Sequence, residues 1–224
     1  MRIPRIYTQQ ALTLNTELQL EEQASNHLAK VLRMQEGREL ILFNGQGGEY
    51  SAVITAIKKK AVLATLNTFT ASSHQSPLAT ELGIAISKGD RMEWLIQKAT
   101  ELGIHNISPL QSENSQLKLN AERMQKKQQQ WQQIAISACE QCGRNIVPTV
   151  NAIQPLEQWL GNVEAEKKLV LHHRSETTLT GDKPSSVALL IGPEGGLSAN
   201  EISYAQEQGF QALTLGPRVL RTET

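Results

Sequence analysis

The first third of the chain contains short apolar runs, partly alternating with polar residues, that are typical of β-strands. Strands are expected at 38–44, 50–57 and 61–67. Glycines at 45, 47 and 48 supply a turn after the first of these strands. One helix is expected at 21–32, because Leu28, Val31 and Leu32 fall on one helical face. Three strands joined by tight turns predict a small β-barrel.

The rest of the chain instead alternates strands with helices. Strands are expected at 79–87, 107–110, 168–172, 187–191 and 210–215. Helices are expected between them, at 91–102, 120–142, 155–160 and 198–208. The strand VALLI is a continuous apolar run, as buried parallel strands are. This rhythm predicts an α/β fold with a mostly parallel sheet and helices on both faces.

A small polar stretch at 70–77 separates the two patterns and ends in a proline, as interdomain linkers do. Residues 1–72 carry 8 Lys and Arg against 6 acidic residues, a net charge of +2. Residues 73–224 carry 14 against 16, a net charge of −2. We therefore expect two domains, 1–72 and 73–224.

Composition excludes several classes of protein. The 224 residues include 22 basic and 22 acidic side chains, so the chain is not a polycation. No apolar run approaches the roughly 18–20 residues that a membrane helix needs, and the first ten residues lack the apolar core of a secretory signal. The chain has only two cysteines, so we expect no disulfide framework. We expect a reduced cytoplasmic setting instead.

Two loops after apolar strands are candidate binding sites, because ligands of open α/β sheets bind at the carboxyl ends of strands. The first is GPEGG at 192–196, which lacks both the Walker lysine and the GxGxxG spacing. A tight strand–helix turn is its simpler interpretation. The second is LGPRVLRTET at 215–224, in which polar side chains gather; a solvated tail explains it equally well.

Three further clusters have simpler structural interpretations. Cys139 and Cys142 end a helix and lack a second ligand pair, so we expect no metal site and two ordinary thiols. His172 and His173 end a strand near the two loops, and a histidine pair without nearby carboxylates is more often structural. Asp90 is a plausible helix N-cap, flanked by Lys88 and Arg91, which could instead contact a phosphate.

Four ordered blocks of the sequence resemble the signatures of one family. They are KGDRMEWLIQKATELGI (88–104), ACEQCGRNIVP (138–148), IGPEGGLSANE (191–201) and LGPRVLRTET (215–224). RIPRIY and HLAKVLRMQEG near the start match as well. The chain thus resembles the RsmE family, rRNA uridine N3-methyltransferases of the trefoil-knotted SPOUT superfamily, over essentially its whole length.

The resemblance implies a PUA-like β-barrel at 1–72 and a SPOUT methyltransferase domain at 73–224. It implies S-adenosylmethionine (SAM) as methyl donor and uridine 1498 of 16S rRNA, in the small ribosomal subunit, as substrate. It also implies a homodimer without a metal or a membrane partner. Family members continue past RTET with an apolar helix that threads the knot, so a chain ending at Thr224 is expected to be less stable, to dimerise poorly and to bind SAM weakly.

The resemblance and the chemistry of SAM together assign candidate residues. The cofactor pocket is expected to use Leu171, Gly192, Pro193, Glu194, Gly195, Leu215, Gly216, Arg218, Leu220 and Thr222. Glu223 is a candidate base for uracil N3, and Arg221 a candidate for stabilising the uracil oxyanion or binding a phosphate. RNA phosphates are expected to contact Arg5, His27, Lys30, Arg33, Lys88 and Arg91.

A branched side chain at Gly195 is expected to enter the adenine space and block SAM binding. Three other functions remain open. The chain could methylate another RNA atom, such as a ribose 2′-hydroxyl, or bind RNA without catalysis. The third, a nucleotide-phosphate enzyme, is disfavoured by the missing Walker lysine.

Overall fold

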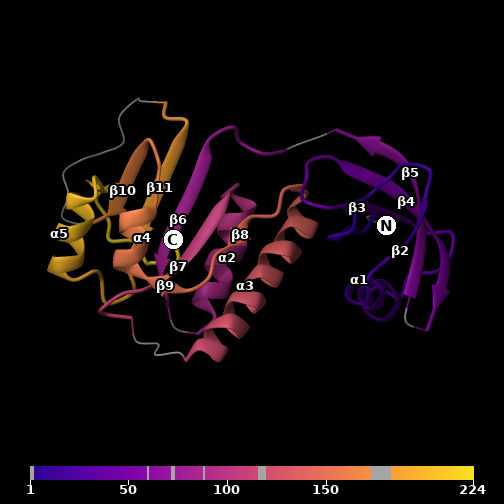
Figure 1. The fold of residues 1–224 in the computed structure, drawn as a ribbon, viewed down its shortest axis with the longest axis horizontal. Helices are drawn as coiled ribbons and strands as arrows, with labels where there is room; N and C mark the ends of the chain where they lie inside the picture. Colours follow the sequence, from indigo (N-terminus) through magenta and orange to yellow (C-terminus); the bar gives the residue numbers. More distant parts are fainter. Residues whose placement is uncertain (1–2, 60, 72–73, 88, 116–119, 173–182) are drawn as a thin grey trace. The chain divides into compact units, whose positions relative to one another are not determined.

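The computed structural model describes the chain except for residues 1–2, 60, 72–73, 88, 116–119 and 173–182. The chain divides into two compact units (Figure 1). Unit 1 comprises Met1–Gln75 together with Ile136–Val147, and unit 2 comprises Ser76–Ala135 together with Pro148–Thr224. The division therefore falls within helix α3 (Ala121–Cys142), whose last residues belong to unit 1.

Unit 1 is built on a five-stranded sheet in the order β1-β3-β4-β5-β2. Its strands are β1 (Arg5–Tyr7), β2 (Glu17–Gln19), β3 (Glu39–Phe43), β4 (Glu49–Lys58) and β5 (Ala61–Thr70). The pairing of β1 with β3 is parallel and the others are antiparallel. Alternate residues of β5, Val62, Ala64 and Leu66, are fully buried in one core. This alternation is the reason that sequence pattern located the three longer strands.

The helix expected at 21–32 forms as two shorter pieces. An α-helix, α1 (Glu22–Asn26), runs directly into a π-helical turn, η1 (His27–Val31). The backbone N–H of Leu32 donates to the carbonyl of His27, five residues earlier, at 2.9 Å. Arg33 then adopts a left-handed conformation with φ of 50°. Such π-turns cannot be read from a 3.6-residue pattern and are frequent at functional sites.

Arg5 joins the first strand of unit 1 to the segment after α3. Its guanidinium forms an ion pair with Glu49 and a hydrogen bond with the side-chain oxygen of Asn145. The guanidinium also lies over the Phe43 ring, 5.0 Å from the ring centroid. Next to it, the carboxylate of Glu140 accepts the backbone N–H of Tyr7 at 3.0 Å. These contacts explain why residues 136–147 belong to unit 1.

Unit 2 contains a seven-stranded sheet in which every recorded pairing is parallel. Its main path is β12-β10-β11-β6-β7-β8, and β9 pairs with β7. The strands are β6 (Ala79–Ala85), β7 (Asn106–Gln111), β8 (Thr149–Val150), β9 (Gln154–Pro155), β10 (Lys167–Leu171), β11 (Ser186–Ile191) and β12 (Gln211–Leu213). The expected α/β fold with a parallel sheet is thus confirmed.

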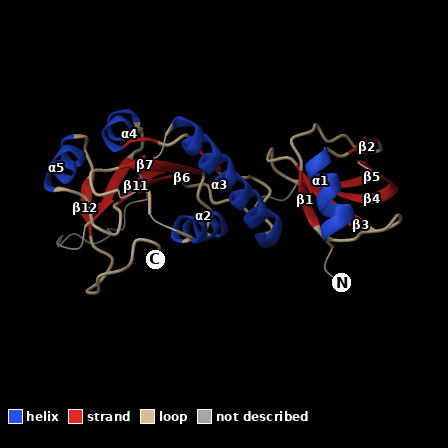
Figure 2. Ribbon diagram, turned by 90° about the horizontal axis from the view of Figure 1, so that it is seen from below, coloured by secondary structure: helices blue, strands red, loops and turns tan. Residues whose placement is uncertain are grey.

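Helices cover both faces of this sheet. They are α2 (Arg91–Glu101), α4 (Leu156–Asn162), α5 (Ala199–Glu207) and the part of α3 that lies in unit 2. Figure 2 shows α4 and α5 on one side of the sheet and α2 on the other. Trp159 of α4 packs into the core, and its indole fills the space that a Cβ at Gly83 would need. Among the described helices, none has the length and apolar character to cross a membrane.

Sequence pattern missed four of the short strands, β1, β2, β8 and β9. They contain two or three residues each, and so few residues carry no alternation. Only pairing with longer neighbours defines them: Arg5 to Tyr7 pair with Ile41 to Phe43, for example.

The two cysteines at the end of α3 differ sharply in their surroundings. Cys139 is fully buried, and this burial raises its pKa to about 12. Cys142 is exposed. Within the described part of the chain, no group of three or more His, Cys, Asp and Glu side chains could hold a metal ion.

We predict that iodoacetamide at about pH 8 labels Cys142 and spares Cys139 in the folded protein, because only a thiolate attacks the reagent. Peptide mass mapping measures the labelling, and a second label should enter only in denaturant. The Cys142→Ser variant is the control and should remain unlabelled until unfolded. Equal labelling of both native thiols would contradict the buried position of Cys139.

A candidate cofactor-binding cavity

A cavity of about 840 Å³ lies at the carboxyl ends of β10, β11 and β12. Because these strands are parallel, their ends meet at one edge of the sheet. Leu171 ends β10 and His172 follows it, Gly192 follows β11, and Thr214 follows β12. The volume falls within the roughly 300–1,000 Å³ of typical small-molecule sites.

The GPEGG turn forms one wall of the cavity. The backbone N–H of Gly196 donates to the carbonyl of Pro193 at 2.8 Å, which closes the turn. Gly196 has a φ of +74°, a left-handed conformation that favours glycine. A Cβ at Gly192 would lie only 3.0 Å from Cγ of Leu197. The turn thus needs glycine at both places, for two different reasons.

Gly195 has more room for a Cβ than Gly192. A Cβ at this position would meet Cβ of Asn114 at 3.4 Å, an ordinary contact. Gly195 also lines the cavity, and the block of SAM binding by a branched side chain at this position stays a prediction.

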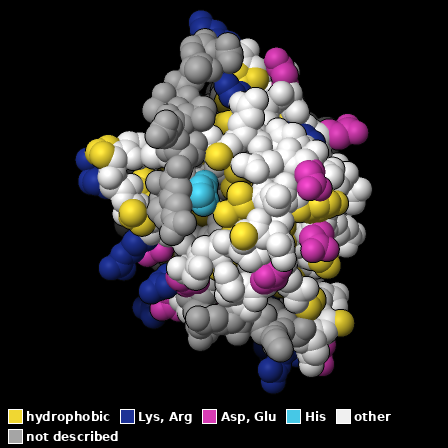
Figure 3. All heavy atoms as spheres, turned by 90° about the vertical axis from the view of Figure 1, so that its left-hand side faces the viewer, with side chains coloured by type: hydrophobic (Ala, Val, Ile, Leu, Met, Phe, Trp, Pro, Cys, Tyr) yellow, Lys and Arg dark blue, Asp and Glu magenta, His cyan; other side chains and the backbone are white. Residues whose placement is uncertain are grey.

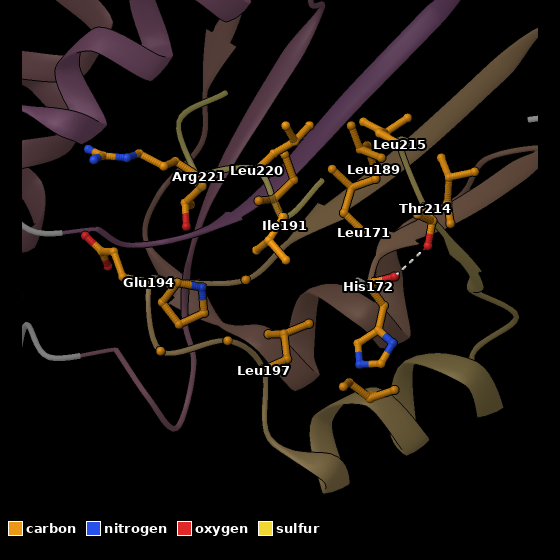
Figure 4. A pocket seen from close by; sticks show the side chains of 18 of the residues that line it. Leu171, His172, Leu189, Ile191, Glu194, Leu197, Thr214, Leu215, Leu220 and Arg221 are labelled. Atoms are coloured by element: carbon orange, nitrogen blue, oxygen red, sulfur yellow. Dashed lines mark hydrogen bonds between the residues drawn. The ribbon is translucent and has the colours of Figure 1, made fainter. Parts of the chain in front are cut away.

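The opposite wall is the segment after β12, and much of the lining is apolar (Figure 4). Leu171, Leu215 and Leu220 lie near one another on one side of the cavity in Figure 4. The hydroxyl of Thr214 donates to the carbonyl of His172 at 3.0 Å, which joins the ends of β12 and β10. Figure 3 shows apolar side chains around a histidine at the centre of the face on the α5 side.

One face of α5 completes the cavity, which sequence reasoning did not anticipate. Ala199, Ile202, Ser203 and Gln206 line it. These residues follow the i, i+3, i+4, i+7 spacing of one helical face. That spacing, read together with the position of α5 directly after the GPEGG turn, is the signal that could have located them.

The charged groups at the cavity are mostly paired. Glu194 in the turn forms an ion pair with Arg91 of α2, with 2.7 Å between Oε1 and NH1. Arg221 lies on the same side of the cavity as Glu194 in Figure 4. Its guanidinium is 3.8 Å from the carboxylate of Glu223, and the Arg221 side chain is 80% exposed while that of Glu223 is 18% exposed.

Most of the candidate cofactor residues therefore come together. Those that line the cavity are Leu171, Gly192, Pro193, Glu194, Gly195, Leu215, Arg218, Leu220 and Thr222, with the candidate catalytic residue Arg221. Gly216 and Glu223 are not among the described residues that line it. Glu223 lies 3.8 Å from the guanidinium of Arg221, which does line the cavity.

The sequence matches two family models. Residues 74–224 match an RNA methyltransferase domain, and residues 20–67 match an RNA methyltransferase PUA domain. The ribosomal RNA small subunit methyltransferase E of Buchnera aphidicola, from the Schizaphis graminum strain, is 36% identical, over 100% of this chain and 92% of its own length. The Bacillus subtilis protein of the same name is 34% identical, over 89% of this chain and 82% of its own length.

The chain belongs to the ribosomal RNA small subunit methyltransferase E family. Solved structures agree with this membership. The Neisseria gonorrhoeae methyltransferase E bound to S-adenosyl methionine has a TM-score of 0.92 and 36% identity, covering 99% of this chain and 92% of its own. A Legionella pneumophila protein in complex with SAM has a TM-score of 0.94 and 43% identity, covering 100% of this chain and 93% of its own.

The candidate RNA-contacting residues of this methyltransferase E family member differ in exposure and in ion pairing. Lys30 in η1 and Arg33, two residues after it, are exposed, and His27 is half-buried at the start of η1. Arg5 is only 9% exposed and is held by Glu49, so it has little free surface for a phosphate. Arg91 is paired with Glu194. Lys88 lies outside the described residues.

The two neighbouring glycines of the turn give a matched test of its geometry. We predict that Gly196→Ala lowers the free energy of unfolding by about 1–2 kcal/mol, because alanine strains the left-handed backbone. The Gly195→Ala variant should change it little, since its Cβ makes an ordinary contact. Urea denaturation of both variants measures the difference. Equal losses would show that the turn does not hold Gly196 in the left-handed conformation.

Proposed function

We propose that the protein transfers a methyl group from SAM to N3 of a uridine in small-subunit rRNA, uridine 1498 of 16S rRNA. The observation that carries this proposal is the cavity at the carboxyl ends of β10, β11 and β12. It occurs in a chain that is similar over its whole length to proteins solved with SAM.

The residues of the cavity fit SAM, which carries an adenine, a ribose and a sulfonium but no phosphate. Leu171, Leu215 and Leu220 provide apolar contacts for the adenine. The backbone of the GPEGG turn and of the segment after β12 provides hydrogen-bonding groups, each worth about 0.5–1.5 kcal/mol net. When bound, SAM supplies an electrophilic methyl group.

The chain's own task in the reaction is to remove the proton of uracil N3 and to bear the resulting charge. Glu223 is the proposed base, and Arg221 the proposed partner for the charge that develops on the uracil oxygens. Their 3.8 Å separation supports joint action.

For the RNA we propose a surface on unit 1 that includes Lys30 and Arg33. Both side chains are exposed, and both lie in or directly after the π-turn η1. The left-handed backbone of Arg33 supports this assignment, because strained non-glycine residues cluster at functional sites.

The remaining expectations from the resemblance stay part of the proposal. They are a division of labour between an RNA-binding domain at 1–72 and a methyltransferase domain at 73–224, a trefoil knot, a homodimer and a cytoplasmic location. The net charges of +2 and −2 support the division of labour.

Methylation of rRNA tests the function directly. Small ribosomal subunits from a bacterial strain that lacks its own methyltransferase E are incubated with the protein and labelled SAM. Nuclease mapping by mass spectrometry should find one methyl group, on N3 of uridine 1498. A methyl group on a ribose, or none on rRNA, would overturn the proposal.

The Glu223→Gln variant should lower kcat by about 10²–10⁴-fold if Glu223 is the base, with SAM affinity unchanged. Glu207→Gln, an exposed change on α5, is its matched control.

The RNA surface predicts a change in salt dependence. Each lost phosphate contact reduces the slope of log K against log salt concentration by about 0.7–0.9, so a double Lys30→Ala, Arg33→Ala variant should flatten it by about 1.4–1.8. Filter binding of small-subunit rRNA at several salt concentrations measures this, with SAM affinity as control. An unaltered slope would place the RNA surface elsewhere.

A further inference from the structure

Glu201 is a buried carboxylate that contacts two different loops. It lies in the first turn of α5 and is only 4% exposed. One oxygen accepts the backbone N–H of Ser198 at 2.8 Å, which is half of a capping box. The other oxygen accepts the backbone N–H of Glu113, also at 2.8 Å. A capping box needs only the first of these bonds, so the second requires another explanation.

The second bond brings the loop after β7 against the GPEGG turn. Next to Glu113, the side-chain amide of Asn114 donates to the carbonyl of Gly196 at 3.0 Å. Cβ of Asn114 also lies against the position where Gly195 would carry a side chain. The segment 112–115 is closed on itself, since the backbone N–H of Ser115 donates to the carbonyl of Ser112 at 3.0 Å.

These contacts reach the cavity through the turn itself. The backbone N–H of Gly196 donates to the carbonyl of Pro193, and both residues line the cavity. Leu197, the next residue, packs so close to Gly192 that a Cβ there would meet it at 3.0 Å. Glu113 and Asn114 do not line the cavity within the described lining set. Any effect of theirs on a ligand must therefore pass through the position of residues 192–197.

We infer that Glu201 and Asn114 are positioning residues, which fix the GPEGG turn from outside in the conformation that binds SAM. We call the loop after β7, residues 112–115, the brace. The Glu201 carboxylate accepts the backbone N–H of Glu113 in the brace, and the side chain of Asn114 donates to the carbonyl of Gly196 in the turn. This inference rests on the proposed function, because it assigns a purpose to the turn in binding SAM.

Three variants separate this role from helix stability. Ser198→Ala breaks the bond from the Glu201 N–H to the Ser198 hydroxyl, 3.2 Å long, but leaves the brace intact. Glu201→Gln places an amide where two backbone N–H groups need acceptors, so one bond is lost. Asn114→Ala removes the bond to Gly196 and leaves the capping box intact. Calorimetric titration with SAM and amide hydrogen exchange of Gly196 are measured for each.

Asn114→Ala and Glu201→Gln should raise the Kd for SAM by about 3- to 10-fold, as the loss of one hydrogen bond does. Both should speed exchange of the Gly196 amide, and kcat at saturating SAM should stay within twofold. Ser198→Ala should lower thermal stability but leave the Kd within twofold. The Asn114 variant keeps the test decisive even if Glu201→Gln does not fold.

Two results would overturn the inference. An unchanged Kd and unchanged exchange in Asn114→Ala would show that the turn holds its shape without the brace. An equal rise in Kd for Ser198→Ala would show that Glu201 acts through helix stability alone. If the wild-type protein does not bind SAM, the proposed function fails, and the exchange of Gly196 still reports whether the brace positions the turn.

Discussion

The parallel pairing of β10 with β11 and β12 is the constraint on which the cavity depends. Strands that run in the same direction bring their carboxyl ends to one edge, here those of Leu171, Ile191 and Leu213. The loops that follow the three strands therefore lie around the same cavity. Residues more than forty positions apart along the chain, such as His172 and Thr214, become hydrogen-bonded neighbours. Antiparallel pairing of β10 with either neighbour would carry that neighbour's loop to the opposite edge.

The same edge also gathers the loops that follow β6 and β7, and these support the cavity from outside. Arg91, at the start of α2, pairs with Glu194, and Asn114, after β7, holds the carbonyl of Gly196. The GPEGG turn is thus held by contacts from two preceding crossover segments as well as by its own backbone bond. A glycine-rich turn has high conformational freedom, so external contacts are a physical means of fixing it.

Unit 1 has a corresponding dependence on a distant segment. Arg5 of β1 binds Glu49 and Asn145, and the latter lies 140 residues away along the chain. A cation removed from water needs such partners, which is why a basic residue near the start of the chain is a structural group here. Two cations stay exposed here: Lys30 lies in η1, whose π-helical bonding departs from a regular helix, and Arg33 lies two residues after it.

The sequence by itself determined the longer elements, the α/β class and the two loops that bound the cavity, because apolar periodicity and glycine position are local properties of the chain. It also carried the family resemblance, which the full-length relatives confirm. The tertiary structure decided the short strands β1, β2, β8 and β9, the lining face of α5 and the burial of Arg5. It alone showed that a side chain at Gly195 would meet Asn114 and that Glu201 serves two loops. Each of these depends on contacts between segments far apart in the chain, and no local pattern encodes a contact of that kind.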